Sequence, residues 1–285
     1  MKFYKVISSL SLPIFVSCVY LSPSELQEPL IHPPLPLSKA PETPETNTSP
    51  DSRRIILRTT SKAISGPYPL YDLLSISTES GSISVSVTPH SASSEDPSQP
   101  ASLELQSKSG SIHASFPGTF AEKSSGVPLR EYITSVSSGS TSISGTFPLG
   151  SHTSIESRSG SVSVELVVAP INVTTGPRRL KTESYSGEQS VRVVDGGFWA
   201  LGKDAWWVGM VSRHETRSGS VDLEYPDSWE GTIEVASKSG STSVTGRGVE
   251  IIREIDGRVF ARKGRESGGK IMVRSASGSV DLRFG

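Results

Sequence analysis

Apolar and polar residues alternate with a period of two along most of the chain after Arg54. In the first clear example, Ile76 precedes a break at Gly81, and Ile83 and Val85 follow it. A period of two places successive side chains on opposite faces of a β-strand. Because Pro and Gly are too frequent for long helices, the pattern predicts an all-β domain over residues 55–285.

The break recurs with nearly the same letters at irregular intervals. Ser-Gly pairs end at Gly81, Gly110, Gly139, Gly160, Gly187, Gly219, Gly240 and Gly278. Recurrence at this scale is typical of stacked supersecondary units. It predicts an irregular, β-helix-like β-solenoid made of strand, SGS turn and strand. A β-sandwich is the alternative, because it would show similar alternation.

Two local features refine this prediction. Glycine at the break indicates a turn with a positive φ or one that otherwise does not tolerate a Cβ atom, as expected for Gly110 and Gly160. The flanking serines can form a ladder of hydroxyls between neighbouring coils. The best helical candidate, residues 248–264, breaks at Gly257 and is rich in β-branched residues, so we expect two strands there.

Several of these repeats carry a family resemblance. The segments "SKSGSI", "SRSGSVSVEL", "WEGTIEVASKSGSTSVTG" and "VRSASGSVDLRFG" resemble a fungal adhesin-like domain of unknown function. They are also similar in style to bacterial adhesin-like proteins with repeated SGS-type strand motifs. The resemblance covers residues 55–285 and implies a β-solenoid fold with a structural or adhesive role. It supplies no functional residues to carry over.

The N-terminal part differs in composition from the rest. Residues 1–21 are first basic and then apolar, which suits a signal peptide and is too short for a confident membrane span. Residues 22–54 are rich in Pro, Ser, Thr and Glu, which predicts a disordered linker. Asn47 and Asn172 both lie in glycosylation sequons. These features predict a secreted or cell-surface glycoprotein, and a cytoplasmic scaffold is the alternative.

Charge and cysteine content exclude some classes of protein. The formal net charge is −1, which is not the electrostatic footprint of a dedicated nucleic-acid binder. The single cysteine, Cys18, allows neither an intramolecular disulfide nor a cysteine-based metal site.

The sequence shows no motif for a nucleophile or a phosphate-binding loop, and its histidines lack metal-ligand spacing. We therefore expect no enzymatic activity, cofactor or metal. A degenerate polysaccharide-active β-helix enzyme is the alternative. Asp222 and Asp281 occupy the same position of their repeats, but the repeat at Gly240 separates them in sequence. We therefore expect them not to be neighbours, as a glycosidase pair would be.

Two groups of residues are candidate binding sites for a cell-wall glycan or a surface protein. The position two residues before the turn glycine is basic at Lys108, Arg158, Arg217 and Lys238. If the coils stack in register, these side chains form a column on one edge. That column could bind anionic glycans or lipid head groups, or it could discourage edge-to-edge aggregation.

The second group lies in residues 196–210, which hold three of the four tryptophans. Exposed aromatic rings can stack on sugars. We expect Trp199 or Trp207 to be exposed beside Lys203 and Asp204, since alternation places Trp207 opposite to Trp206. The alternative is that these rings are part of the core.

Overall fold

The computed structural model describes residues 45–46, 52–116, 128, 130–169, 177–196 and 206–285. The chain divides into residues 1–42 and residues 43–285, and the fold is that of the second unit. Most of the expected linker, residues 22–54, lies outside the described residues, although residues 45–46 and 54 belong to strands.

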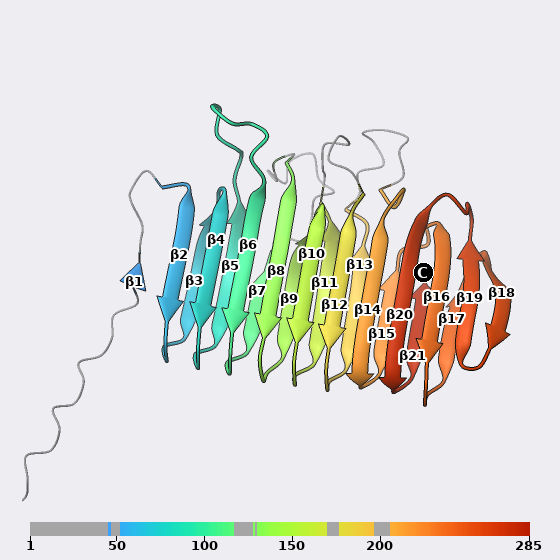
Figure 1. The fold of residues 1–285 in the computed structure, drawn as a ribbon. Helices are drawn as coiled ribbons and strands as arrows, with labels where there is room; N and C mark the ends of the chain where they lie inside the picture. The colour runs from blue at the N-terminus through green and yellow to red at the C-terminus, as the bar shows by residue number, and fades with distance from the viewer. Residues whose placement is uncertain (1–44, 47–51, 117–127, 129, 170–176, 197–205) are drawn as a thin grey trace, which may run out of the picture. The chain divides into compact units, whose positions relative to one another are not determined.

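The described residues form two β-sheets that face each other (Figure 1). In spatial order, the twelve-stranded sheet consists of β1 (Glu45–Thr46), β2 (Arg54–Thr59), β4 (Leu73–Thr78), β6 (Ala101–Ser107), β8 (Tyr132–Ser138), β10 (His152–Ser157), β12 (Arg179–Ser184), β14 (Val211–Ser218), β20 (Gly269–Ser277), β16 (Gly231–Ser237), β19 (Arg258–Lys263) and β18 (Val249–Ile255). The nine-stranded sheet consists of β17 (Thr242–Gly246), β21 (Val280–Phe284), β15 (Val221–Tyr225), β13 (Gln189–Val194), β11 (Val162–Val168), β9 (Ile143–Leu149), β7 (Ile112–Ser115), β5 (Ile83–Pro89) and β3 (Ile64–Leu70).

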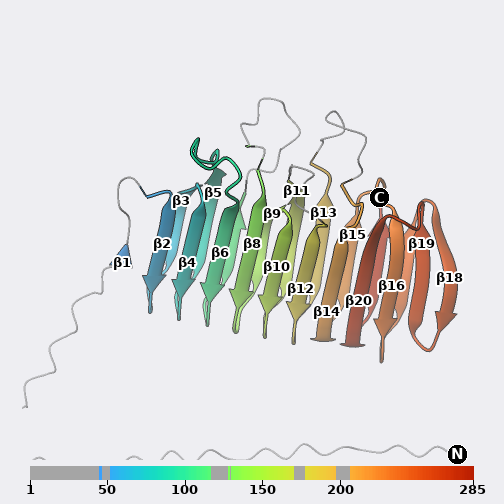
Figure 2. The same cartoon turned by 45° about the horizontal axis from the view of Figure 1, so that its top comes forward.

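The chain winds between these sheets as a β-solenoid, which confirms the predicted fold class. A coil consists of one strand of the twelve-stranded sheet, a short turn, and the next strand in the nine-stranded sheet. Neighbouring coils pair in parallel, residue against equivalent residue, as in Thr78↔Ser107 and Ile83↔Ile112. The short turns lie in one row at the lower edge of Figure 1, and Figure 2 shows longer connections at the opposite edge, including residues 90–100.

The inward residues of both sheets fill a continuous core between them. In β5, Ile83, Val85 and Val87 are buried while the residues between them are exposed. The alternation read from the sequence therefore corresponds to a core-facing and a solvent-facing side. The expected pair of strands in residues 248–264 is also confirmed, because β18 and β19 form an antiparallel hairpin around Asp256 and Gly257.

The last coil in the sequence is not the last coil of the stack. Strand β20 lies between β14 and β16, and β21 lies between β15 and β17. The β20/β21 coil is therefore inserted between the two coils that precede it in sequence. The β18–β19 hairpin pairs with the far side of β16, at that end of the twelve-stranded sheet.

The opposite end of the nine-stranded sheet is protected by proline. Its edge strand β3 contains Pro67 and Pro69, which have no backbone N–H group to offer to another strand. Such residues discourage edge-to-edge association of sheets.

Candidate functional site

The short turns between the two sheets form the most regular surface of the molecule, which we call the turn ridge. Each turn contributes four residues between an inward-facing Ser or Thr, buried at every turn but the first, and the first inward residue of the next strand. The ridge consists of residues 60–63, 79–82, 108–111, 139–142, 158–161, 185–188, 217–220, 276–279 and 238–241, in spatial order.

At several turns, a buried hydroxyl just before the turn helps to fix it to the neighbouring coil. The Gly110 N–H donates to Ser107 Oγ at 2.8 Å, and Ser107 Oγ donates to the Gly81 carbonyl of the preceding coil at 3.2 Å. Ser157 repeats this arrangement with Gly160 at 3.0 Å and Thr141 at 3.2 Å. The sequence analysis missed this role, although a Ser or Thr three residues before most turn glycines signals it.

The turn glycines allow the coils to approach each other closely. A Cβ atom on Gly110 would lie 1.9 Å from the Gly81 carbonyl oxygen, and one on Gly160 would lie 2.1 Å from the Thr141 carbonyl carbon. The prediction that these two positions do not tolerate a Cβ atom is therefore confirmed. At both positions the cause is contact between backbones, and neither residue has a positive φ.

One turn has a different register from the one predicted. Because Ser107 pairs with Ser138 and Ile112 pairs with Ile143, Thr141 occupies the position of the turn glycine in this coil. Gly139 lies two positions earlier, opposite Lys108. The sequence "SSGSTS" allows either alignment, and the pairing of the buried residues on both sides determines the one observed.

The second position of every turn is an exposed serine, and together these residues form the serine file. The file consists of Ser61, Ser80, Ser109, Ser140, Ser159, Ser186, Ser218, Ser277 and Ser239, in spatial order. A second row of serines occupies the fourth position of most turns. In that row, Ser111 Oγ lies 3.3 Å from Ser82 Oγ, and Ser241 Oγ lies 3.0 Å from Ser279 Oγ. The expected ladder of hydroxyls is thus present at these contacts.

The four predicted basic residues do lie on this edge, all of them exposed at the first position of their turns, but they are not neighbours. The residues between them in the stack are Gly139, Tyr185 and Ala276. They form a column on this edge, as expected, with one uncharged residue between each cation and the next. The shifted register around Gly139 and the inserted β20/β21 coil each place an uncharged residue between two cations.

The basic residues differ in their contacts. Lys108 Nζ lies 2.5 Å from Glu79 Oε1, in an exposed ion pair. The Arg217 guanidinium lies over the Tyr185 ring, 4.2 Å from its centroid, and donates to the Tyr185 hydroxyl. Within the described residues, no carboxylate forms an ion pair with Arg158 or Lys238.

Of the predicted tryptophan site, the structure describes only Trp207. Trp199, Lys203 and Asp204 lie outside the described residues. Trp207 is buried, with 8% of its surface exposed, and it packs edge to face on Trp206 at 5.7 Å. The prediction that Trp207 is exposed is wrong because residues 206–209 form a turn, to which strand alternation does not apply.

Comparison with known families agrees with this architecture. A profile of the Toastrack DUF4097 family, whose function is unknown, matches residues 47–283. The chain belongs to this family. Searches of curated proteins and of solved structures found no match to the chain. The specific resemblance to fungal adhesin-like proteins is not supported beyond membership of this β-repeat family.

The Toastrack domain also brings together two carboxylates that were expected to lie apart. Asp222 and Asp281 are direct partners on β15 and β21, because the β20/β21 coil is inserted next to β14/β15. The sequence analysis assumed that coils stack in sequence order, and this assumption is wrong here. Arg283 forms an ion pair with Asp222, and its Nε lies 3.6 Å from Asp281 Oδ2.

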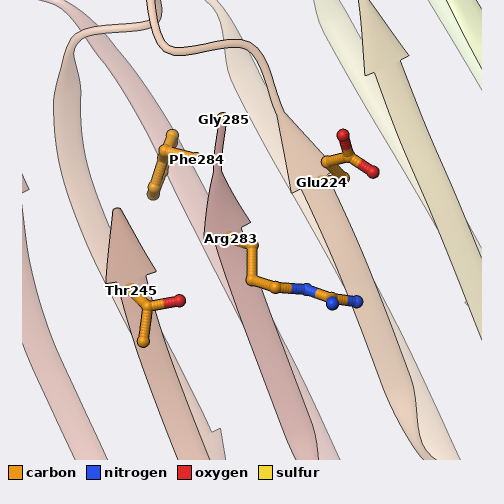
Figure 3. Close-up of a pocket in the computed structure, with 5 residues that line it drawn as sticks. All are labelled: Glu224, Thr245, Arg283, Phe284 and Gly285. Carbon is orange, nitrogen blue, oxygen red and sulfur yellow. The ribbon is translucent and has the colours of Figure 1, made fainter. Parts of the chain in front are cut away.

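A hollow of about 360 Å³ lies beside this arginine on the Toastrack domain (Figure 3). It is lined by Glu224, Thr245, Arg283, Phe284 and Gly285. The Arg283 side chain extends from β21 toward the strand that carries Glu224. Its one cation, Arg283, is already paired with two carboxylates.

One fully buried titratable group, His214, belongs to the interior of the domain. Its Nδ1 lies 2.7 Å from Thr182 Oγ1 while its Nε2 lies 2.9 Å from the Tyr225 hydroxyl. Burial lowers the pKa of His214 to about 3, because the charged imidazolium would lose its hydration. The side chain is therefore neutral at ordinary pH. Both its nitrogens are engaged in the core.

The remaining expectations concern metals, glycosylation and the membrane. Among the described residues, His, Cys, Asp and Glu form no cluster of three or more that could hold a metal ion. Asn47 and Asn172 both lie outside the described residues. The described part of the chain contains no helix with the length and apolar character needed to cross a membrane.

Proposed function

We propose that this Toastrack protein is a non-enzymatic, adhesin-like scaffold that binds a glycan or protein along its turn ridge at the cell surface. The observation that carries the proposal is the repetition of one exposed side chain, serine, at the same position of every turn. A file of identical groups on hydrogen-bonded coils is a preorganised surface for a ligand that repeats at the same interval.

The construction of the ridge supports this role. Most turns are fixed to a neighbour by backbone contact at a turn glycine, and several also by buried hydroxyls such as Ser107 and Ser157. A ligand therefore meets groups that lose little conformational freedom on binding. Each single contact is weak, but many contacts along one ligand add up to useful avidity.

The alternative of a polysaccharide-cleaving enzyme has one observation in its favour, the adjacency of Asp222 and Asp281. Arg283 pairs with both carboxylates, and both lie half-exposed on the outer face of the sheet. A general acid needs a carboxyl group whose protonated form is favoured, whereas a guanidinium between the two acids favours their charged forms. The scaffold is therefore the better-supported function.

The test is to screen the full chain for binding to glycans and surface proteins, and to measure the release of reducing ends from the same glycans. We expect binding without release. Release that is lost in Asp222→Asn or Asp281→Asn would support the enzyme instead. Expression in a secreting host tests the proposed location, since a secreted protein should gain mass at Asn47 or Asn172.

A further inference from the structure

From Lys108 to Lys238, the cations at the first position of the turns recur at a fixed interval along the stack. Lys108, Arg158, Arg217 and Lys238 belong to the β6/β7, β10/β11, β14/β15 and β16/β17 coils. The order of the strands places one further coil between each of these and the next. The cations therefore recur every two coils, which corresponds to about 9.6 Å.

The serine file supplies a second interval on the same surface. One exposed hydroxyl belongs to every coil, so hydroxyls recur at about 4.8 Å, the spacing of paired strands. Between Lys108 and Lys238, the first two positions of the turns thus present one serine hydroxyl per coil and one cation per two coils, all on the same edge.

An extended polysaccharide has the same ratio of intervals. One sugar ring advances such a chain by nearly one strand spacing, and a disaccharide advances it by nearly two. Building on the function proposed above, we infer that the turn ridge binds a linear polysaccharide with one acidic group on every second sugar. The acidic group is a uronate carboxylate or a sulfate ester, and the serine hydroxyls bond the sugar rings between the cations.

The contacts of the cations favour the half of the ridge between Arg158 and Lys238. Neither of these two side chains is held by a carboxylate among the described residues. Tyr185, which lies between Arg158 and Arg217, holds the Arg217 guanidinium by stacking at 4.2 Å and is a positioning residue. Lys108 is already paired with Glu79, and such an exposed pair exchanges readily with a ligand anion.

The same spacing argues against a nucleic acid as the ligand. Duplex DNA carries one charge per about 1.7 Å of its length, so a row with one cation per about 9.6 Å would neutralise only a small share of it. The single file of cations also lacks the width of a basic patch. Sparse charge with many hydroxyls fits a sparsely charged, hydroxyl-rich polymer.

The first experiment measures binding of the full chain to three soluble polymers. Hyaluronan carries one carboxylate per disaccharide, carboxyl-reduced hyaluronan carries none, and keratan sulfate carries sulfate esters without carboxylates. We expect hyaluronan or keratan sulfate to bind at least about tenfold more tightly than the neutral polymer, with an affinity that falls as salt rises. The polymer that binds identifies the acidic group. Equal binding of charged and neutral polymers would overturn the inference.

The second experiment removes the cations one at a time. Arg158→Gln, Arg217→Gln and Lys238→Gln should each weaken binding about two- to fivefold, and the triple variant about tenfold or more. Ala276→Glu should weaken it as well, because it places an acid between Arg217 and Lys238, while Ala276→Gln should not. Tyr185→Phe should retain most of the binding and Tyr185→Ser should lose as much as Arg217→Gln.

Arg179→Gln and Lys270→Gln are the matched controls, because these exposed cations lie on the outer face of the twelve-stranded sheet. They change the net charge equally and should leave binding unchanged. Equal losses in ridge and control variants, or no loss in the ridge variants, would overturn the inference. If the inference about the acidic polysaccharide fails but other glycans or proteins bind, the proposed function still stands. If no glycan or protein binds the wild-type chain at all, the proposed function fails.

Discussion

The buried hydroxyls beneath the turn ridge allow a matched test of what stabilises the stack. Ser157 and Ser275 occupy the same position of different coils and are similarly buried, with 3% and 5% of their surfaces exposed. Ser157 Oγ takes part in two hydrogen bonds, whereas Ser275 Oγ is buried without a partner among the described residues. The substitutions Ser157→Ala and Ser275→Ala therefore remove the same atom from two different environments.

The expected magnitudes follow from this difference. Ser157→Ala leaves the Gly160 N–H and the Thr141 carbonyl without the hydroxyl that linked the two coils, which should cost about 2 kcal/mol of unfolding free energy. Ser275→Ala removes a hydroxyl that was desolvated without a bond, so its effect should lie within about 0.5 kcal/mol or be stabilising. For a domain of this size, Ser157→Ala should lower Tm by about 4–8 °C.

Thermal and urea unfolding of the full chain, followed by circular dichroism, measures both variants. Because repeat stacks can unfold in parts, hydrogen exchange of the 158–161 turn should be followed as well, and it should accelerate only in Ser157→Ala. Equal losses of stability in the two variants would refute the proposed role of these hydroxyls.

Three further outcomes are expected. Gly160→Val should lower the free energy of unfolding by at least about 2 kcal/mol, because the new Cβ atom would lie 2.1 Å from the Thr141 carbonyl carbon. A variant as stable as the wild type would contradict the close approach of the coils. Trp207→Ala should cost about 3–5 kcal/mol, measured by urea unfolding, and a neutral effect would mean that the ring is not in the core. Burial lowers the pKa of His214 to about 3 in the folded state, whereas its ordinary value is 6.5. Below pH 6.5 the unfolded state therefore binds a proton that the folded state does not, and the free energy of unfolding should fall as pH drops toward 3. Between pH 7.5 and pH 5 this histidine should account for about 2 kcal/mol, and His214→Gln should flatten that part of the curve.

The strands and turns of the coils were predictable from the sequence because they depend on short-range features of the chain. Period-two alternation defined the strands, and the repeated glycines marked where backbones meet. The basic residues were placed on the correct edge for the same reason. Trp207 was misplaced because the strand rule was applied to a turn, and no local signal distinguishes the two in "WWVGM".

The order of the coils was not predictable from these patterns. The β14/β15 and β20/β21 coils share the letters "SGSVDL", but similarity between two repeats does not show that their coils are neighbours in the stack. What distinguishes the two sides of β16 is the β18–β19 hairpin, which occupies its far side and leaves the C-terminal coil to pair on the near side. The contact between Asp222 and Asp281 and the spacing of the ridge cations both follow from this long-range choice.

Disulfide trapping on the turn ridge tests this order most directly. In a Cys18→Ser background, Ser218→Cys with Ser277→Cys should oxidise to an intramolecular disulfide, because the two residues are direct partners on β14 and β20. Ser218→Cys with Ser239→Cys, which are closer in sequence, should not, since their coils are two strand spacings apart, about 9.6 Å. A disulfide in the second pair and none in the first would show that the coils stack in sequence order, and would contradict the insertion of the C-terminal coil between β14/β15 and β16/β17.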